Sequence, residues 1–370
     1  MKRFFECLLP ITKCNLFCEY CYVVQNDNMT LQDAYLKYSP EQIGKSLTQQ
    51  RLGGVCFFSI CGAGETMLQK ELCDIVYQLL KNGHFVNITT NGTITKAFKN
   101  ISQFPQDFLE RIHFSFSLHY LELKRTNLLE TFFNNVRLVK EIGSSYFTQI
   151  NLYDGYIPII DEIKSVCMKE IGEIPQCILT RLNNSDSYVP YTKLTMEEYV
   201  NYGRHFDSPY FELSIKNFNV RRNDFCYAGD WSGVLNLSTG LLKKCYRSYG
   251  AFNIFKNENK PINFEPIGKC PQDYCVNASH FLTLGCIPEL DFPSYASIRN
   301  RNSIVKKIDG GYTSIMLEFL SQKLSEDNKI LSQKEKNKIN IINRKWNYIN
   351  MIKKKFRFLK KFINLNVVKK

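Results

Sequence analysis

Three cysteines stand within eight residues near the start of the chain, at positions Cys14, Cys18 and Cys21. They follow the apolar run Phe4–Ile11, which predicts a first β-strand. In an α/β protein the loop after a strand lies at the C-terminal edge of the sheet, where ligand sites concentrate. Three thiolates can hold one metal centre and still leave a coordination position open, as a catalytic metal or cluster requires. The spacing therefore predicts metal chemistry.

This loop resembles the CxxxCxΦC motif of the radical S-adenosylmethionine (radical SAM) enzymes, with Tyr20 at the aromatic position. The resemblance implies that the three thiolates hold three irons of a [4Fe-4S] cluster, whose fourth iron chelates the amino and carboxylate groups of SAM. The longer string from Cys14 to Tyr22 is typical of members that modify peptides and proteins. The alternatives are structural zinc or incidental buried cysteines, but the nearest histidine is His84.

The segment 57–65 is an apolar strand candidate that ends in a glycine-rich turn. Its residues Ala63, Gly64 and Glu65 resemble the GGE motif of the radical SAM family, although Thr66 stands where a proline is common. Glycines let a backbone approach a ligand closely, and carbonyls at a strand end can accept hydrogen bonds from the SAM ammonium group. A plainer alternative is that Glu65 only favours the N-terminus of the next helix.

Other polar residues stand at the ends of the third and fourth predicted strands. Asn91 belongs to a Thr-Asn-Gly turn that resembles one often seen in the family, and it also fits an ordinary turn. Ser115 and Ser117 share one strand face, and Ser117 is our predicted partner of the SAM ribose because it is nearer the C-terminal end. His119 is a weak candidate for a substrate-side acid or base, with a solvated loop histidine as the alternative.

Five further cysteines occupy an irregular segment rich in Asn, Gly and Pro. Such a segment needs a bound metal or another cross-link to hold its fold. The spacing Cys226-x13-Gly240-x4-Cys245 resembles the opening of the SPASM/Twitch domains of radical SAM enzymes, and the resemblance implies an auxiliary [4Fe-4S] cluster. Five thiols suit one cluster rather than two, with structural zinc as the alternative. The expected ligands are Cys226 and Cys245, completed by Cys270 and Cys275, with Cys286 as a substitute. We interpret the other cysteines as core residues: Cys7, Cys56, Cys61, Cys73, Cys167 and Cys177.

The predicted secondary-structure elements that position these residues alternate between strands and helices. Strand candidates begin at residues 54, 85, 111, 146 and 175, a spacing of 26 to 35 residues that is typical of βα units and a parallel sheet. Helix signals separate them, including a cap at Ser39 and a capping box at Thr195. The pattern leaves open a partial barrel or an open sheet, whereas the resemblance implies a partial (β/α)6 TIM-like barrel. We predict a radical SAM core at 1–215, a small cysteine-rich domain at 216–300 and a basic helical tail at 301–370.

Composition and charge exclude two classes of protein and locate the net charge. The 370 residues are 44% hydrophobic and 22% charged, so bulk disorder is excluded, and 14 cysteines are too few for a disulfide scaffold. The net charge of +13 belongs to the last 70 residues, which hold 18 Lys and Arg against 5 Asp and Glu. Apolar residues there, from Ile342 to Ile363, follow helical spacing opposite lysines. Such a helix can pack on the body, or contact a membrane surface, a partner or nucleic acid.

The resemblance implies an enzyme that cleaves SAM reductively and uses the resulting 5′-deoxyadenosyl radical to abstract hydrogen from a substrate. We expect a peptide or protein side chain as substrate and a small flavodoxin- or ferredoxin-type protein as electron donor. Oxidation of a small alcohol or sugar, a nucleic-acid-modifying enzyme and a non-catalytic iron–sulfur or zinc protein are the alternatives. The N-terminus shows no secretion signal, and no apolar run is long enough to cross a membrane. A cytoplasmic protein is therefore expected, with peripheral membrane contact through the tail as an alternative.

Overall fold

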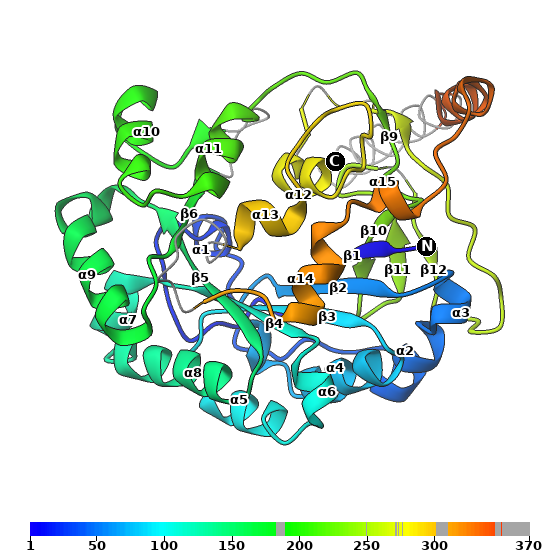
Figure 1. The fold of residues 1–370 in the computed structure, drawn as a ribbon. Coiled ribbons are helices and arrows are strands. Elements are labelled where there is room, and N and C mark those ends of the chain that lie inside the picture. The colour runs from blue at the N-terminus through cyan, green and yellow to red at the C-terminus, as the bar shows by residue number, and fades with distance from the viewer. Residues whose placement is uncertain are drawn as a thin grey trace, which may run out of the picture.

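A nine-stranded sheet forms the centre of the protein in the computed structural model, which describes residues 1–344 and 349 except 183–188, 249, 271, 273, 276 and 301–309 (Figure 1). The strand order is β12-β11-β10-β1-β2-β3-β4-β5-β6. The strands are β1 (Arg3–Leu9), β2 (Cys56–Gly62), β3 (Phe85–Thr90), β4 (Ile112–Ser117), β5 (Ser145–Leu152), β6 (Gln176–Leu179), β10 (Ser232–Asn236), β11 (Leu241–Lys243) and β12 (Phe252–Asn253).

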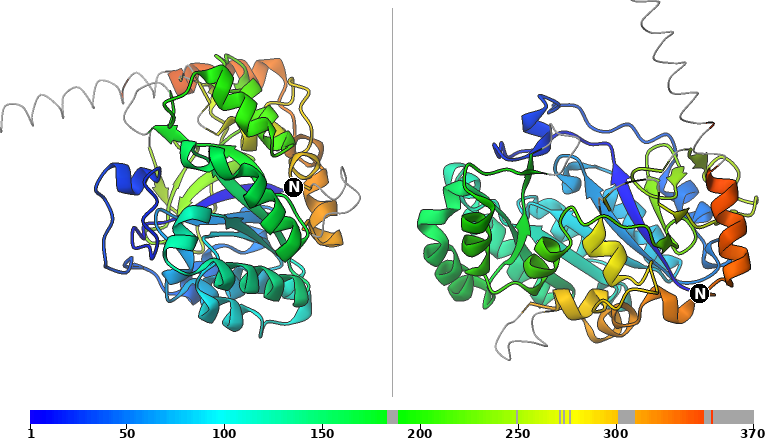
Figure 2. Two further views of the ribbon diagram at one scale, coloured as in Figure 1. Left: turned by 90° about the vertical axis from the view of Figure 1, so that its left-hand side faces the viewer. Right: turned by 90° about the horizontal axis from the view of Figure 1, so that it is seen from above.

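The first six strands confirm the predicted βα pattern. They lie in chain order, and each pairs in parallel with the next, as right-handed βα crossovers require. The sheet curves as a partial TIM-like barrel with helices on its outer side (Figure 1). The cysteine-bearing loop after β1 lies at the opposite end of the sheet from the N-terminus in both views of Figure 2.

The two helix starts predicted from capping residues are confirmed. The hydroxyl of Ser39 accepts a hydrogen bond from the Gln42 amide, and Thr195 forms a capping box with Glu198. The helical elements up to the sixth strand are α1 (Tyr22–Gln25), α2 (Pro40–Ser46), α3 (Gln49–Leu52), η1 (Thr66–Leu68), α4 (Leu72–Lys81), α5 (Thr95–Ile101), α6 (Gln106–Leu109), α7 (Tyr120–Arg125), α8 (Leu129–Glu141), η2 (Asp154–Ile159) and α9 (Ile160–Ile171).

The segment after β6 returns to the barrel. Its strand β10 pairs in parallel with β1, so residues 232–253 continue the main sheet on the free side of β1. The remaining elements are β7 (Arg181–Leu182), β8 (Val189–Pro190), α10 (Met196–Arg204), α11 (Pro209–Lys216), β9 (Phe225–Cys226), β13 (Gly268–Lys269), α12 (Ala278–Thr283), α13 (Tyr295–Arg299), α14 (Ser314–Ser321) and α15 (Leu324–Asp327).

Two apolar cores hold this arrangement together. The larger core lies between the sheet and its outer helices and includes Val86, Phe114 and Val136. The second joins the barrel to the C-terminal segment, and in it Phe4 of β1 contacts Tyr295 of α13 with ring centroids 5.7 Å apart. Each buried aromatic ring contributes about 2–3 kcal/mol through burial, so the C-terminal segment is firmly attached to the barrel.

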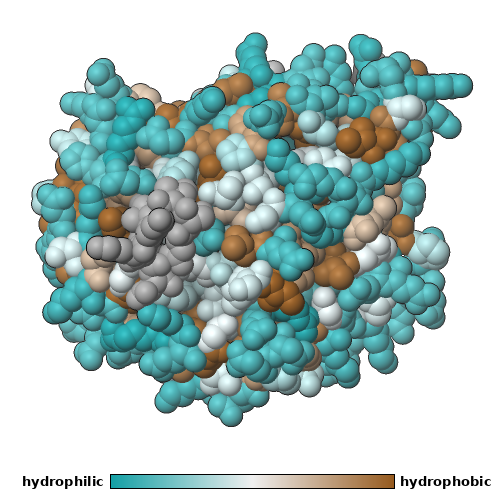
Figure 3. All heavy atoms as spheres, in the orientation of Figure 1, coloured by the Kyte–Doolittle hydropathy of each residue, from teal (hydrophilic) through white to brown (hydrophobic). Residues whose placement is uncertain are grey.

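The chain beyond α15 begins as a helix at 333–344, which packs on the C-terminal segment. Asn343 donates to the Ile267 carbonyl over 2.9 Å, and Lys336 forms an ion pair with Glu289. The predicted basic face at 353–363 lies outside the described residues. Among the helices described, none is long and apolar enough to cross a membrane. On the face shown in Figure 3, hydrophilic residues dominate and apolar residues form small separate groups.

Candidate active site

The loop that carries the first three cysteines opens into a cavity of about 800 Å³ at the C-terminal ends of the parallel strands. This is the place where α/β folds bind ligands. The structure brings every residue predicted for the SAM site into the wall of this one cavity: Cys14, Cys18, Tyr20, Cys21, Ala63, Gly64, Glu65, Asn91, Ser117 and His119.

Gly64 holds the turn after β2 against the cysteine loop. Its amide donates to the Ile11 carbonyl over 2.6 Å, and the next amide, of Glu65, donates to the Lys13 carbonyl over 2.9 Å. A Cβ atom at Gly64 would lie 2.2 Å from that Lys13 carbonyl oxygen, which is backbone and cannot turn aside. Only glycine fits this close approach, so Gly64 fixes the position of the residue next to Cys14.

Glu65 uses its carboxylate to join the turns after β2 and β3. Oε1 accepts from the Met67 amide at 2.9 Å and the Thr90 hydroxyl at 2.7 Å, while Oε2 accepts from the Asn91 amide at 2.7 Å. Burial raises the pKa of this carboxyl, and these three hydrogen bonds oppose the increase. Glu65 thus caps the helical turn η1, as the plainer interpretation expected, and also supports Asn91.

Asn91 connects this framework to the cysteines. Its amide nitrogen Nδ2 lies 3.8 Å from Cys14 Sγ and donates to Asn15 Oδ1 over 2.8 Å, while its own Oδ1 accepts from the amide and hydroxyl of Thr93. Hydrogen bonds to cysteine sulfur are one of the means by which a protein adjusts the potential of an iron–sulfur cluster. Asn91 is therefore positioned to act on a ligand of the centre as well as to line the cavity.

The thiols of Cys14 and Cys18 are both disfavoured as thiolates in the absence of a metal. Burial is the main cause that raises the pKa of Cys14 to about 11, and the neighbouring charges of Glu65 and Cys21 act in the same direction. Burial also raises the pKa of Cys18, with further contributions from Cys14, Glu122 and Cys21. Thiolates that are unfavourable on their own become favourable when metal cations neutralise them, so this group suits a cationic centre.

Tyr20 and His119 form a polar contact on the wall of the same cavity. The Tyr20 hydroxyl lies 2.8 Å from His119 Nδ1 and 3.0 Å from the Tyr156 hydroxyl. Burial lowers the pKa of His119 to about 4, so its imidazole is neutral near pH 7. His119 is thus held by the protein beside the cysteine loop, which differs from a freely solvated loop histidine.

The two serines of β4 face different parts of the barrel interior. Ser117 lines the cavity of the cysteine loop and lies 3.2 Å from Gln149 Nε2. Ser115 lines a second, deeper cavity and donates to Asn87 Oδ1 over 2.8 Å. The structure thus places Ser117, and not Ser115, beside the predicted SAM residues.

The five cysteines of the second group also come together, behind the wall of the large cavity. Cys226 lies on β9 and has Cys286, Cys275 and Cys245 near enough to raise its thiol pKa, after burial as the main cause. Cys270 raises the pKa of both Cys245 and Cys275 in the same way. The structure therefore does not single out four of the five as a set.

Among the residues described, no three His, Cys, Asp or Glu side chains converge as ligands of one metal ion. A single zinc ion requires its thiolates about 2.3 Å from one point, whereas a cluster distributes its cysteines over several irons. The remaining cysteines are mostly core residues, as predicted. Cys61 and Cys73 differ because they are only partly buried, and Cys61 also lines both cavities.

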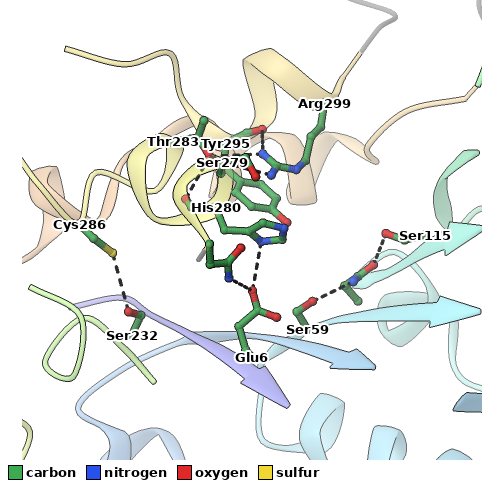
Figure 4. A network of polar contacts seen from close by, with 12 residues as sticks. Glu6, Ser59, Ser115, Ser232, Ser279, His280, Thr283, Cys286, Tyr295 and Arg299 are labelled. Atoms are coloured by element: carbon green, nitrogen blue, oxygen red, sulfur yellow. Dashed lines mark hydrogen bonds and ion pairs between the residues drawn. The ribbon is translucent and has the colours of Figure 1, made fainter. Parts of the chain in front are cut away.

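The sequence did not lead us to predict one polar group in the barrel. Glu6 of β1 is buried, accepts from Asn277 Nδ2 over 3.0 Å and lies 3.2 Å from His280 Nδ1 (Figure 4). Burial opposes ionisation of Glu6, but His280, Asn277 and Tyr246 together hold its pKa below the ordinary value. A glutamate in an apolar strand is the one signal that could have revealed this group, since strand interiors rarely bury an unpaired charge.

With this geometry established, comparison with known proteins identifies the domain. Residues 8–164 match the model of the Radical SAM superfamily. Residues 8–164 of the chain are therefore similar to a radical SAM domain. Such a domain indicates an enzyme and implies a [4Fe-4S] cluster and SAM as cofactors. Its match contains the three cysteines and the Gly64, Asn91 and Ser117 positions described above.

Solved structures similar to this chain include SuiB of Streptococcus suis bound to S-adenosylmethionine, with a TM-score of 0.48 and 14% identity over 69% of this chain and 64% of SuiB. The structure of SuiB bound to its precursor peptide SuiA has a TM-score of 0.46 and 16% identity, and the match covers 70% of this chain and 63% of SuiB. The structure of histidine-tagged anSMEcpe with bound AdoMet has a TM-score of 0.45 and 15% identity, and the match covers 69% of this chain and 76% of anSMEcpe. The chain thus spans less than two thirds of the length of SuiB. No curated protein matches it in sequence.

Proposed function

We propose that this chain is a radical SAM enzyme that modifies a peptide or protein side chain. The observation that carries the proposal is the single cavity in which the three-cysteine loop meets the Gly64–Glu65 turn, Asn91 and Ser117. A cluster held by Cys14, Cys18 and Cys21 would supply the electron that cleaves SAM to methionine and a 5′-deoxyadenosyl radical.

The residues of the chain would bind and orient SAM around that centre. Backbone carbonyls at Ala63 and Gly64 would accept from the ammonium group, and the Ser117 hydroxyl would bond the ribose. Asn91 would hold Cys14 in place through its 3.8 Å contact with the sulfur. The partly enclosed cavity would restrict water and keep the radical near its substrate. His119, neutral and held by Tyr20, is a candidate for a proton acceptor on the substrate side.

The second cysteine group supports an auxiliary [4Fe-4S] cluster held by four of Cys226, Cys245, Cys270, Cys275 and Cys286. Its members influence one another electrostatically, and residues beside two of them, Tyr246 and Asn277, line the large cavity. An auxiliary centre at this place would lie one layer behind the substrate, where it could accept an electron or bind the substrate. A flavodoxin- or ferredoxin-type protein would serve as electron donor.

A peptide substrate is favoured by the Cys14–Tyr22 string, which is typical of peptide- and protein-modifying enzymes. SuiB, one of the similar structures, has been crystallised with a precursor peptide. Oxidation of a small alcohol or sugar is the second candidate, favoured by the single-cluster cysteine count. The cytoplasm is the proposed location, because reduced thiols are required as ligands.

Iron and product analysis test this proposal. Anaerobically reconstituted protein should bind about eight irons per chain and form 5′-deoxyadenosine from SAM with dithionite. Cys18→Ala should abolish that product, because one iron loses its thiolate. The matched control is Cys167→Ala, which removes a buried thiol far along the chain in α9 and should leave product formation intact. Binding of zinc alone, or normal product formation by Cys18→Ala, would refute the proposed function.

A further inference from the structure

A second cavity of about 580 Å³ lies deeper in the barrel and shares Glu6, Cys61 and Gly62 with the wall of the large cavity. The strands β2 to β6 line it with polar side chains: Ser59, Asn87, Ser115, Gln149 and Gln176. The C-terminal segment faces them with Tyr210, His280, Tyr295, Arg299 and Tyr312. A substrate group placed here would lie directly beside the proposed SAM site, and the polar wall favours a polar group.

Arg299 is a buried cation in this wall, and it has no acidic partner among the residues that the structure describes. It is 7% exposed, and its hydrogen bonds reach only neutral oxygens, on Thr283 at 3.3 Å and on the Tyr295 and Ser279 backbones at 3.3 and 3.4 Å. Figure 4 shows it on the α13 side of the cavity, near Tyr295. The faces of Tyr295 and Tyr210 lie 3.7 and 4.5 Å from its guanidinium carbon. Ring contacts offset only part of the cost of burying a charge, so an anion would complete the site.

Two buried polar atoms beside Arg299 have no hydrogen-bond partner within the described part of the chain. These are the Tyr312 hydroxyl and His113 Nε2, on rings whose centroids are 4.8 Å apart, and both residues line the cavity. His113 Nδ1 lies 3.2 Å from Ser145 Oγ, whose hydroxyl donates to the Ile112 carbonyl. That arrangement places the imidazole proton on Nδ1 and leaves Nε2 as an acceptor. The Tyr312 hydroxyl is thus the group free to donate to an anion held by Arg299.

The acid in this wall does not neutralise Arg299. Glu6 is the sole Asp or Glu among the described residues that line the deeper cavity, and it is engaged by Asn277 and His280. No ion pair joins Glu6 to Arg299 within the part of the chain that the structure describes. The cavity therefore has an acidic side at the junction with the SAM site and a cationic side at Arg299.

We propose that the deeper cavity binds a carboxylate of the substrate through Arg299 and Tyr312. This inference rests on the proposed function and specifies its substrate class: a peptide that presents an acidic side chain or its C-terminal carboxylate inside the barrel. A guanidinium can hold a carboxylate by two parallel hydrogen bonds, and the tyrosine hydroxyl adds a third. His113 Nε2 would accept from an N–H or O–H next to that carboxylate.

Two pairs of small probes test this site on the reconstituted full chain by ligand-observed NMR titration. Acetyl-glutamate amide and acetyl-glutamine amide represent a side chain, and acetyl-glycyl-glycine and its C-terminal amide represent a chain end. At least one acid should bind about 10-fold more tightly than its amide. Arg299→Lys should reduce that preference about 10-fold, because a lysine ammonium group cannot form the two parallel hydrogen bonds of a planar guanidinium. Tyr312→Phe, which removes only one hydroxyl, should reduce it about 5-fold.

Arg204→Lys provides the matched control, since Arg204 forms an exposed ion pair with Glu212 on the outer helices, and it should leave probe binding unchanged. Equal binding of acid and amide in both pairs would overturn the inference, as would a preference that survives both Arg299→Lys and Tyr312→Phe. Formation of 5′-deoxyadenosine by the unsubstituted protein is measured separately. If that product forms and no acid is preferred, the carboxylate site alone is wrong. If acid is preferred and no product forms, the proposed function alone is wrong.

Discussion

Individual residues in this site act mainly by holding one another. Glu65 is the clearest case, because its two oxygens accept three hydrogen bonds from Met67, Thr90 and Asn91 and leave little capacity for a ligand. Asn91 in turn reaches the sulfur of Cys14. The GGE-like and Thr-Asn-Gly turns, whose residues Glu65 and Thr90 are 25 positions apart, are thus a single support for the cysteine loop.

Gly64→Ala should disrupt that support. The added Cβ would require the Gly64 turn or the backbone at Lys13 to move by about 1 Å, since the two would otherwise be 2.2 Å apart. A displacement of this size at a catalytic centre lowers rates about 100-fold, and we expect that loss in 5′-deoxyadenosine formation.

Gly143→Ala is the control for this substitution. Gly143 has a positive φ, of 76°, but ends a helix at the opposite edge of the sheet and has only the Gln106 side chain nearby. Its loss should cost about 1 kcal/mol of stability and leave the yield of 5′-deoxyadenosine per bound iron unchanged. Equal activity of the two variants would show that close packing at Gly64 is unimportant.

At the scale of elements, local patterns predicted the barrel strands well. All six strand candidates are present, because apolar runs separated by capped helices determine parallel βα units without long-range information. Pairing of β10 with β1 was not predicted, since nothing in five residues of strand indicates a partner more than 200 positions away. The contact of Glu6 with Asn277, 271 positions apart, was missed for the same reason. The place of Ser117 in the wall of the large cavity was predictable because strand alternation and nearness to the strand end are local properties.

The elements β9 and β11 provide a test of the auxiliary centre. They position Cys226 and Cys245, and the two thiols are buried near each other. Cys245→Ala should therefore lower bound iron from about eight to about four per chain, because the second cluster loses a ligand. Absorption and paramagnetic resonance spectra of the cluster on the Cys14 loop should persist.

Cys177→Ala is the matched control, as Cys177 is a fully buried thiol in β6. It should retain the full iron content and lose only packing energy, on the order of 1 kcal/mol. Two intact clusters in Cys245→Ala would contradict the ligand assignment and would leave Cys226, Cys270, Cys275 and Cys286 as the ligand set.

At the scale of the whole molecule, most of the excess positive charge of the tail lies beyond residue 344. Residues 345–370 hold nine Lys and Arg and no acid, so a chain that ends at 344 has a net charge of +4 instead of +13. The helix at 333–344, by contrast, contacts the cysteine-rich segment. Asn340 accepts from the Lys269 amide at 2.8 Å, and the Leu331 amide donates to the Tyr227 hydroxyl at 2.8 Å. Tyr227 follows Cys226 directly, so residues 331–344 support the region of the proposed auxiliary site.

Two truncations should therefore behave differently. A chain that ends at residue 344 retains the helix at 333–344 and its contacts, whereas one that ends at 330 loses at least three hydrogen bonds to the cysteine-rich segment. At about 1 kcal/mol each, these bonds predict a melting temperature about 5 °C lower for the shorter chain than for the longer one. Because the lost contacts lie beside Cys226, iron bound by the second group should be removed by a chelator before iron bound by the Cys14 loop. Calorimetry and timed chelation measure both effects, and identical behaviour of the two truncated chains would show that the helix at 333–344 contributes nothing to the auxiliary site.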